Sequence, residues 1–493
     1  MKNLKRWICA MLAVLLTRSV LSCSASTENA GEDLAADAAG ADGAVADPAA
    51  EAEPETEKAW LDNLPEDLNF DGATCNMLIR SERIDDMFQF EMTGEGVVDA
   101  LCDRTIRLED RLGIAFTTDI LPSDSGQWKS AIAGSVQAAD GAYDIVFPDY
   151  WWGIELGGYY CNLLEAPYMD FSQPYWCAGW NDNDTFYGKL YTAVGDFSLD
   201  LIVNTEAVFF NKKLISDNGL EDPYELVKED RWTSDRIVAM SEAALRDLDG
   251  DGKYNPLNDV FGLCYYLHGG RGFLYAYGMK LANRTDDGGW EINYFNDRFV
   301  RIYETVYRMQ NETPSVCYNN GGIDFNGRFA SGNLLFLVGT IGTARGTALR
   351  EMEDDFGLVP YPKLDEEQKD FISFNLGTSY AAILKSAQDT GLSAAVLEAL
   401  CAENHKSVVP ALYEDALKEK YSRDQTTAEM LDILSRTIYY DFAFVNDAAL
   451  SALCNVYFDA IAAKNPDVAS RFKSTDKMTQ KLLAKLLASY QGD

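Results

Sequence analysis

Three short apolar runs decide the fold: CNMLI at Cys75–Ile79, IAFTT beginning at Ile114, and AYDIVF at Ala142–Phe147. Between them, apolar residues recur at helical spacing, first from Val98 to Leu112 and then from Trp128 to Val136. Strands that alternate with helices at this interval predict parallel βαβ units whose helices cover the sheet. In an open sheet of this kind, ligands bind beyond the carboxyl ends of the strands.

The same alternation continues along the chain. We expect further strands at Lys189–Val194, Leu199–Thr205, Phe261–Tyr266, Leu334–Val338, Phe356–Tyr361 and Tyr380–Leu384, and helices near Lys212–Asn218, Ser234–Arg246 and Phe299–Met309. From Leu392 onward the sequence is typical of helices almost throughout. Two α/β groups followed by helices suit two lobes joined by crossing segments.

Four segments carry a resemblance to a known family. They are AYDIVFPDYWW (142–152), GKLYTAVGDFSLDLIVNTEAVFFNKKLISDNGLEDPYELVKEDRWT (188–233), FNGRFASGNLLFLVGTIGTARGTALREMEDDFGLVPYPKLDEEQ (325–368) and LEALCAENHKSVVPALYEDALKEKY (397–421). The second is the most specific, because an FFNKKL helix is followed by DPYEL and a Trp-Thr helix start. From about Asp71 to its carboxyl end, the chain resembles family 1 extracellular solute-binding proteins, which include sugar-binding lipoproteins of Gram-positive bacteria.

The resemblance implies an α/β, two-lobed periplasmic-binding-protein-like fold of type II. We expect residues 66–195 and 352–390 to form lobe 1, residues 196–351 to form lobe 2, and the helices of residues 391–493 to pack on both. The implied function is capture of a small solute, with a mono- or oligosaccharide favoured, and its delivery to the permease subunits of an ABC importer. Such a protein acts as a monomer without catalysis, and its ligand shifts the lobes toward closure.

The amino-terminal sequence MKNLKRWICAMLAVLLTRSVLSC places basic side chains ahead of a short apolar run. That pattern predicts an export signal over residues 1–22, because the run is too short to span a membrane stably. The end of the segment resembles the bacterial lipobox, which implies that Cys23 is acylated, with palmitate, and anchors the protein at the extracellular face of the cell membrane. The alternative is an unmodified cysteine after an ordinary signal.

Acidic residues dominate the chain, which has a net charge of -36. Residues 23–57 are nearly all Ala, Gly, Asp, Glu and Pro, and this composition predicts a disordered tether, since little apolar surface is available for burial. The acidic balance argues against nucleic acid or an anionic membrane surface as the partner. Contact with the membrane is therefore expected through the lipid anchor alone.

The remaining cysteines are scattered without a CxxC pair, so neither a zinc site nor a redox motif is indicated. Those within apolar runs are interpreted as small core residues. Cys161 and Cys177 are close enough in sequence to pair across a loop, and the spacing leaves that question open.

The segment DLDGDGKYNPLND, residues 247–259, has the carboxylate spacing of an EF-hand calcium loop. Its oxygen ligands would come from Asp247, Asp249, Asp251 and the carbonyl of Lys253, with a glycine in the sixth position. The usual glutamate at position twelve is replaced by asparagine, and Asp259 follows one residue later as the closing candidate. The alternative is a plain Gly- and Asp-rich turn between a helix and a strand.

Aromatic residues are dense between residues 147 and 191, which favours a sugar ligand, because flat rings pack on the apolar faces of sugars. Asp149, Tyr150, Trp151 and Trp152 come directly after the third strand and are our main ligand-binding candidates. Further candidates are Asp196, Thr340, Arg345 and Asn375. The alternative for each ring is a place in the core. Asp196 has the alternative of a helix or turn cap, and Arg345 that of an ion pair with a surface acid.

Other functions stay open at the level of sequence. A secreted acidic α/β protein could be a glycoside hydrolase with a carboxylate pair, although no GxSxG or HExxH motif is present. The acidic balance also permits a peptide or polyamine as the bound solute, and an adhesion or sensor lipoprotein would share the anchor and tether. The only cofactor that the sequence indicates is a structural calcium ion.

Overall fold

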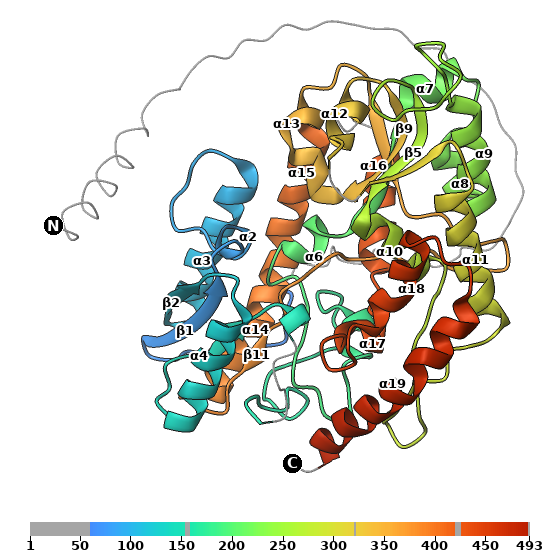
Figure 1. Cartoon of the computed structure of the whole chain (residues 1–493). Helices are drawn as coiled ribbons and strands as arrows, with labels where there is room; N and C mark the ends of the chain where they lie inside the picture. Colours follow the sequence, from blue (N-terminus) through green and yellow to red (C-terminus); the bar gives the residue numbers. More distant parts are fainter. Residues whose placement is uncertain (1–59, 153–157, 320–321, 420–424, 492–493) are drawn as a thin grey trace, which may run out of the picture. The chain divides into compact units, whose positions relative to one another are not determined.

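The computed structural model describes residues 60–152, 158–319, 322–419 and 425–491 (Figure 1). The predicted signal over residues 1–22, the anchor Cys23 and the tether of residues 23–57 lie outside the described residues. Trp151 is described for its backbone alone. Within this part of the chain, no helix combines the length and the apolar character needed to cross a membrane.

The first sheet has four strands in the order β11-β3-β1-β2. They are β1 (Ala73–Arg80), β2 (Ile114–Leu121), β3 (Ile145–Phe147) and β11 (Ala382–Ile383). β1 runs parallel to β2 and β3, whereas β11 is antiparallel to β3. The three strands predicted from the apolar runs and their parallel arrangement are therefore confirmed.

Two helices connect these strands, as the helical spacing predicts. α3 (Gly96–Leu112) ends at Gly113, whose φ of 60° is the left-handed conformation that glycine adopts without strain. α4 (Ser125–Ala138) begins after Asp124, whose side chain accepts a hydrogen bond from the backbone N–H of Gln127. Each helix places an apolar stripe, including Leu101 and Trp128, in the core.

The second sheet has five strands in the order β10-β4-β9-β5-β8. They are β4 (Glu206–Asn211), β5 (Phe261–Tyr266), β8 (Val316–Asn319), β9 (Leu334–Thr340) and β10 (Phe356–Val359). β5 is parallel to β8 and β9, and β4 is antiparallel to both of its neighbours. Every residue of β4 is buried, which explains its continuous apolar run AVFF.

Helices cover this sheet and continue through the carboxyl-terminal region as far as Gln491 (Figure 1). The remaining elements are α2 (Ile84–Met87), η1 (Tyr150–Trp152), α5 (Ala178–Asn181), α6 (Asp200–Val203), α7 (Lys212–Asp217), α8 (Pro223–Lys228), α9 (Ser234–Ala244), α10 (Leu267–Ala276), β6 (Asn283–Arg284), β7 (Trp290–Glu291), α11 (Asp297–Asn311), α12 (Phe325–Ala330), η2 (Ile341–Arg345), α13 (Thr347–Arg350), α14 (Thr390–Glu403), η3 (Asn404–Val408), α15 (Val409–Glu419), α16 (Gln425–Arg436), α17 (Phe442–Val445), α18 (Leu453–Ala462) and α19 (Val468–Gln491). The helical carboxyl-terminal segment is thus confirmed.

Two predicted strands are wrong. Leu199–Thr205 contains the helix α6, and the strand begins only at Glu206. Lys189–Val194 makes isolated bridges instead, one of which joins Ala193 to Ala381. An apolar run of four to six residues has no period that separates a strand from one turn of helix, and the surrounding structure decided both cases.

Two segments cross between the two sheets and a third runs beside them, and we name all three the crossing segments. They comprise residues 199–206, 373–380 and 437–441. Thr205 pairs with Asn375 and Ser373 pairs with Ile438, so the second segment hydrogen-bonds to the other two. Our predicted lobe boundary placed residues 352–390 with the first sheet, but β10 within that range pairs with β4 of the second sheet. The chain therefore returns to the first sheet after Val359.

The close packing of α9 on β5 predicts the effect of one glycine substitution. A Cβ atom at Gly262 would lie 2.4 Å from backbone atoms of Ser241 in α9. Gly262→Ala should therefore lower the free energy of unfolding by about 1–3 kcal/mol, because the helix must move off the strand. Urea denaturation followed by circular dichroism measures this change.

Gly134→Ala is the matched control, since a Cβ atom at Gly134 in α4 meets nothing within 4 Å. We expect this variant to be neutral or stabilised by up to about 1 kcal/mol, as alanine is the better helix former. Equal stability of the two variants would contradict the packing described for α9.

Candidate functional site

Polar side chains gather at the carboxyl edge of the four-stranded sheet. Arg80 is the last residue of β1, Asp149 follows β3, and Ser379 precedes the antiparallel strand β11, so all three share one edge. Arg80 Nη1 donates to Asp149 Oδ2 at 2.6 Å, and Nη2 donates to Ser379 Oγ at 2.7 Å. The Arg80 side chain is buried, whereas Asp149 is partly exposed. Asp149 thus stands at the edge that the strand order indicated, held by an ion pair.

The aromatic residues after β3 occupy different environments. Trp152 is half-buried, with its ring 5.5 Å from that of Trp128 and 5.8 Å from the Arg80 guanidinium. Tyr150 is 3% exposed, and its hydroxyl donates to the carbonyl of Leu376. Tyr150 is therefore a core residue, which was the alternative interpretation of these rings. Of the two, Trp152 retains exposed surface for a ligand.

A second polar group lies at the corresponding edge of the five-stranded sheet. Glu206 begins β4 directly opposite Thr340 at the end of β9, and Tyr361 follows β10 at the same edge. The Tyr361 hydroxyl donates to Glu206 Oε2 at 2.6 Å. Burial raises the pKa of Glu206 to about 7, although the Tyr361 hydrogen bond and the Arg271 charge act in the opposite direction.

Arg271 is the half-buried cation of this edge. It lies on α10, which starts immediately after β5, and its Nε is buried without a hydrogen-bond partner among the described residues. Burial lowers the pKa of the neighbouring His268, and the Arg271 charge adds to that effect. Arg271 also acts electrostatically on Asp447 and on the hydroxyl of Tyr150 after β3. The Arg271 charge therefore lies within electrostatic range of a residue that follows β3 of the first sheet.

Arg345 provides a second link of this kind. It is exposed at the end of η2, which follows β9. Burial and the Asp200 charge raise the pKa of Asp86, and the charges of Arg83 and Arg345 act in the opposite direction. Thr340, half-buried at the end of β9, lies 3.4 Å from Thr343 between hydroxyl oxygens. The structure thus places Thr340 and Arg345 at the carboxyl edge of the second sheet.

Asn375 has a different position from the one expected. Its side chain is fully buried in a crossing segment, where Nδ2 donates to the carbonyl of Leu201 at 2.7 Å and to Thr205 Oγ1 at 3.1 Å. These bonds join two crossing segments, and they occupy the amide that a ligand would need. Its place is in the connection between the sheets.

Asp196 lines a separate cavity of about 560 Å³ beside the crossing segments. Its Oδ2 lies 2.6 Å from Nδ1 of His405, which belongs to the π-turn η3 between α14 and α15. Aromatic side chains, among them Trp176 and Tyr413, line the same cavity. The structure therefore separates Asp196 from the residues at the two sheet edges.

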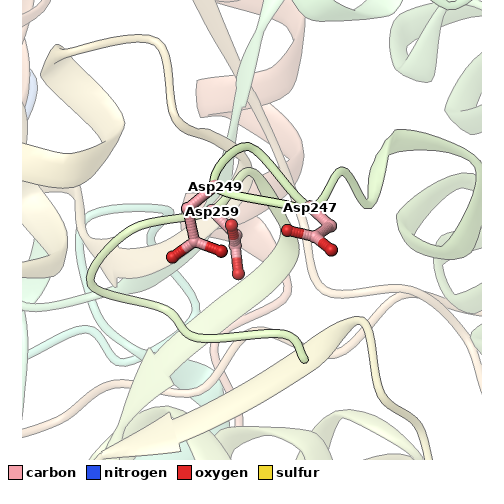
Figure 2. Close-up of side chains that lie close together, drawn as sticks. All are labelled: Asp247, Asp249 and Asp259. Carbon is pink, nitrogen blue, oxygen red and sulfur yellow. The ribbon is translucent and has the colours of Figure 1, made fainter. Parts of the chain in front are cut away.

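The acidic loop joins α9 to β5 and gathers three of its carboxylates (Figure 2). Oxygen atoms of Asp247, Asp249 and Asp259 lie within 4.8 Å of one another, as a divalent cation requires, whereas Asp251 lies outside this group. Asp259 is fully buried and accepts backbone hydrogen bonds from Leu248 and Asn255, which lower its pKa. It thus stands where a closing ligand would.

The backbone of this loop is organised around the same carboxylates. Asp247 accepts hydrogen bonds from the N–H groups of Gly250 and Gly252, and both glycines have positive φ. The side chain of Asn258 donates to Asp249 Oδ2 at 3.2 Å. Asn258 at position twelve therefore supports a carboxylate, and Asp259 is the residue that joins the group of three.

Comparison with solved structures identifies the fold. The sugar-binding protein MalE of Xanthomonas citri is 15% identical over 85% of this chain and 100% of its own, with a TM-score of 0.60. The GacH receptor of Streptomyces glaucescens, solved unliganded and with acarbose, is 13% identical over 85% of this chain and 99% of its own, with a TM-score of 0.53. The fold is a two-lobed periplasmic-binding-protein-like fold of type II, as expected.

A third similar structure is an ABC transporter solute-binding protein of Thermotoga lettingae with bound α-D-tagatose. It is 13% identical over 84% of this chain and 100% of its own, with a TM-score of 0.50. No known family model and no curated protein sequence matches the chain.

The Asp196–His405 pair predicts a pH dependence of stability. The hydrogen bond that His405 donates to the Asp196 carboxylate raises the pKa of His405, while burial opposes it. A raised folded-state pKa stabilises the protein fully below the ordinary histidine value of about 6.5, and this stabilisation is lost as pH rises through the folded value. Because the His405 side chain is 37% exposed, screening limits the effect to about 1 kcal/mol or less.

His405→Gln keeps a hydrogen-bonding side chain and removes the titration. Between about pH 6 and about pH 8, the free energy of unfolding should fall more in the wild type than in this variant, as measured by urea denaturation. His268→Gln is the control. His268 is the other of the two histidines in the sequence, and its pKa is lowered, so its titration changes the stability at pH values below this range. Identical profiles for wild type and His405→Gln would refute the effect.

Proposed function

We propose that this protein is the extracellular substrate-binding component of an ABC importer, and that it binds a mono- or oligosaccharide between its lobes without catalysis. The observation that carries the proposal is the paired arrangement of polar and aromatic side chains at the carboxyl edges of two sheets joined by crossing segments. Asp149 and Trp152 come from one edge, and Thr340, Arg345 and Arg271 come from the other.

The chemistry of these residues suits a sugar. A ring of Trp152 can pack on the apolar face of a pyranose, while carboxylates and guanidinium groups hydrogen-bond its hydroxyls. The similar structures named above include a sugar-binding protein and proteins solved with acarbose and with α-D-tagatose. Contacts from both lobes exist together only in the closed state, so ligand binding favours closure.

Delivery to the importer follows from the same proposal. The basic and apolar start of the sequence and the lipobox-like segment support a lipid anchor at Cys23, on the extracellular face of the membrane. The acidic residues 23–57 would then serve as a tether between the anchor and the binding domain. The partner is the pair of permease transmembrane subunits, which distinguish the closed state from the open one.

Arg271→Gln tests the ligand site. The half-buried guanidinium has an Nε without a hydrogen-bond partner among the described residues. Its loss should weaken sugar binding by about tenfold or more, because a hydrogen bond from a charged donor contributes about 1.5–3 kcal/mol. A glycan panel screened by thermal shift identifies the ligand, and isothermal titration calorimetry measures the affinity of each variant.

Arg236→Gln is the matched control, because Arg236 lies on α9 and pairs with Glu221 at an exposed position. This variant should bind the sugar as tightly as the wild type. A glycan that binds both variants equally, or a panel in which no sugar binds and a polyamine or peptide does, would overturn the assignment. Recovery of the ligand unchanged after incubation distinguishes binding from hydrolysis.

We also propose that the loop of residues 247–259 binds a structural calcium ion through Asp247, Asp249 and Asp259. The grouping of three carboxylate oxygens at the junction of α9 and β5 supports it. An ion there would neutralise adjacent carboxylates and hold the helix to the strand.

Chelation tests the calcium site. Removal of calcium with EDTA should lower the melting temperature by several degrees, and added calcium should restore it, because the ion stabilises only the folded state. Asp249→Asn should lose this response, whereas Asp286→Asn, at an exposed position outside the loop, should keep it. A melting temperature that does not depend on calcium in the wild type would exclude the site.

A further inference from the structure

A cavity of about 710 Å³ on the surface beside the crossing segments has a charge opposite to that of the whole protein. Four cationic side chains line it, namely Lys228, Lys280, Lys369 and Arg436, against the single carboxylate of Asp370. The complete chain has 42 Lys and Arg residues and 78 Asp and Glu residues. The excess of cations is therefore a local feature, and we name this cavity the basic pocket.

Two of the four cations have a structural explanation. Lys228 ends α8 and Arg436 ends α16, and cations at helix carboxyl ends are favoured by the backbone carbonyl groups there. Both also have carboxylate neighbours, since Lys228 lies 3.3 Å from Glu429 and Arg436 lies 3.4 Å from Asp432. Their positive charges are thus partly matched within the protein.

The other two cations have no such explanation. Lys280 and Lys369 are exposed, neither belongs to a helix, and neither has an ion pair with the described part of the chain. Lys280 Nζ lies 5.3 Å from the centre of the Tyr439 ring, which places the ammonium group at the wall of the basic pocket. Two lysines from separate loops, neither in an ion pair within the described residues, therefore line one cavity. The Lys280 charge also acts at longer range on Asp441, which is not among the residues that line this cavity.

The remaining walls of the basic pocket are apolar. Phe371, Ile372, Ile433 and Ile438 line it together with the cations. Apolar walls lower the local dielectric around an anion held against them, which strengthens its attraction to the ammonium groups. The size of the pocket falls in the range of small-molecule sites. The charge of the rest of the protein opposes an anion only weakly, because the Debye length at physiological salt is about 8 Å.

We propose that the basic pocket binds a small multivalent oxyanion of the phosphate or sulfate class between Lys280 and Lys369. Lys228 and Arg436 widen the positive region around it. The site is independent of the sugar site, since none of its lining residues belongs to the two sheet edges described above. Its occupant contacts Ile438 and Tyr439 of one crossing segment and Ile372 next to another, so it lies between two of these segments.

Titration of the full-length protein with pyrophosphate tests the proposal, with sulfate as a second probe and sodium chloride of equal ionic strength as the salt control. Isothermal titration calorimetry should show saturable binding of pyrophosphate or sulfate and none of chloride. Lys280→Ala/Lys369→Ala should weaken that binding by about tenfold, since two charge-assisted contacts are lost. The stronger of the two probes identifies the oxyanion class.

Lys129→Ala/Lys477→Ala is the matched control, because it removes the same charge from two exposed helical positions on α4 and α19. Its affinity for the probe should equal that of the wild type. Equal losses in both double variants would show a general charge effect and overturn the proposal, as would the absence of saturable binding in the wild type. Sugar binding measured on the same samples reports separately on the ligand site.

Discussion

The arrangement of the site depends on the hydrogen bonds that the buried carboxylate of Asp200 accepts. It is fully buried in the first crossing segment, and it accepts hydrogen bonds from the backbone N–H and hydroxyl of Ser379 and from the hydroxyl of Thr378. Arg80 lies 3.7 Å away at the end of β1. A buried charge is tolerated only with such partners. Satisfying Asp200 therefore holds two crossing segments against the edge of the first sheet.

The sequence predicted the helices and strands that have a regular apolar pattern and whose ends are marked by a glycine or by polar turn residues. α3 has a regular apolar stripe and a glycine at its end, and β5 and β9 are apolar runs between polar turns. The exact path of residues 186–206 was not predictable in this way. There the backbone makes isolated bridges and a short helix, and several of its hydrogen-bond partners come from residues 373–381, far away in sequence.

The candidate site was predicted where a residue directly follows a strand. Asp149, Trp152, Thr340 and Arg345 all lie at carboxyl edges, although their contact with a ligand stays a prediction. Arg271 was missed, yet its position on the helix that follows β5 is a signal of the same kind. Glu206 and Tyr361 could not be found from sequence, because antiparallel pairing brings the start of one strand to the end of another. Tyr150 and Asn375 are buried and hydrogen-bonded within the protein, and no local sequence pattern reveals this burial.

The π-turn Asn404–Val408 joins α14 to α15, and the orientation of α15 depends on how many residues this turn contains. A π-turn holds one residue more than a regular helical turn. Each residue of an α-helix advances the chain by about 100° around the axis, so losing one residue would straighten the turn but rotate every later side chain of α15 by that angle. Side chains that now meet α3 would face elsewhere. The segment can thus accept exchanges of residue type far more readily than a shift of helical phase.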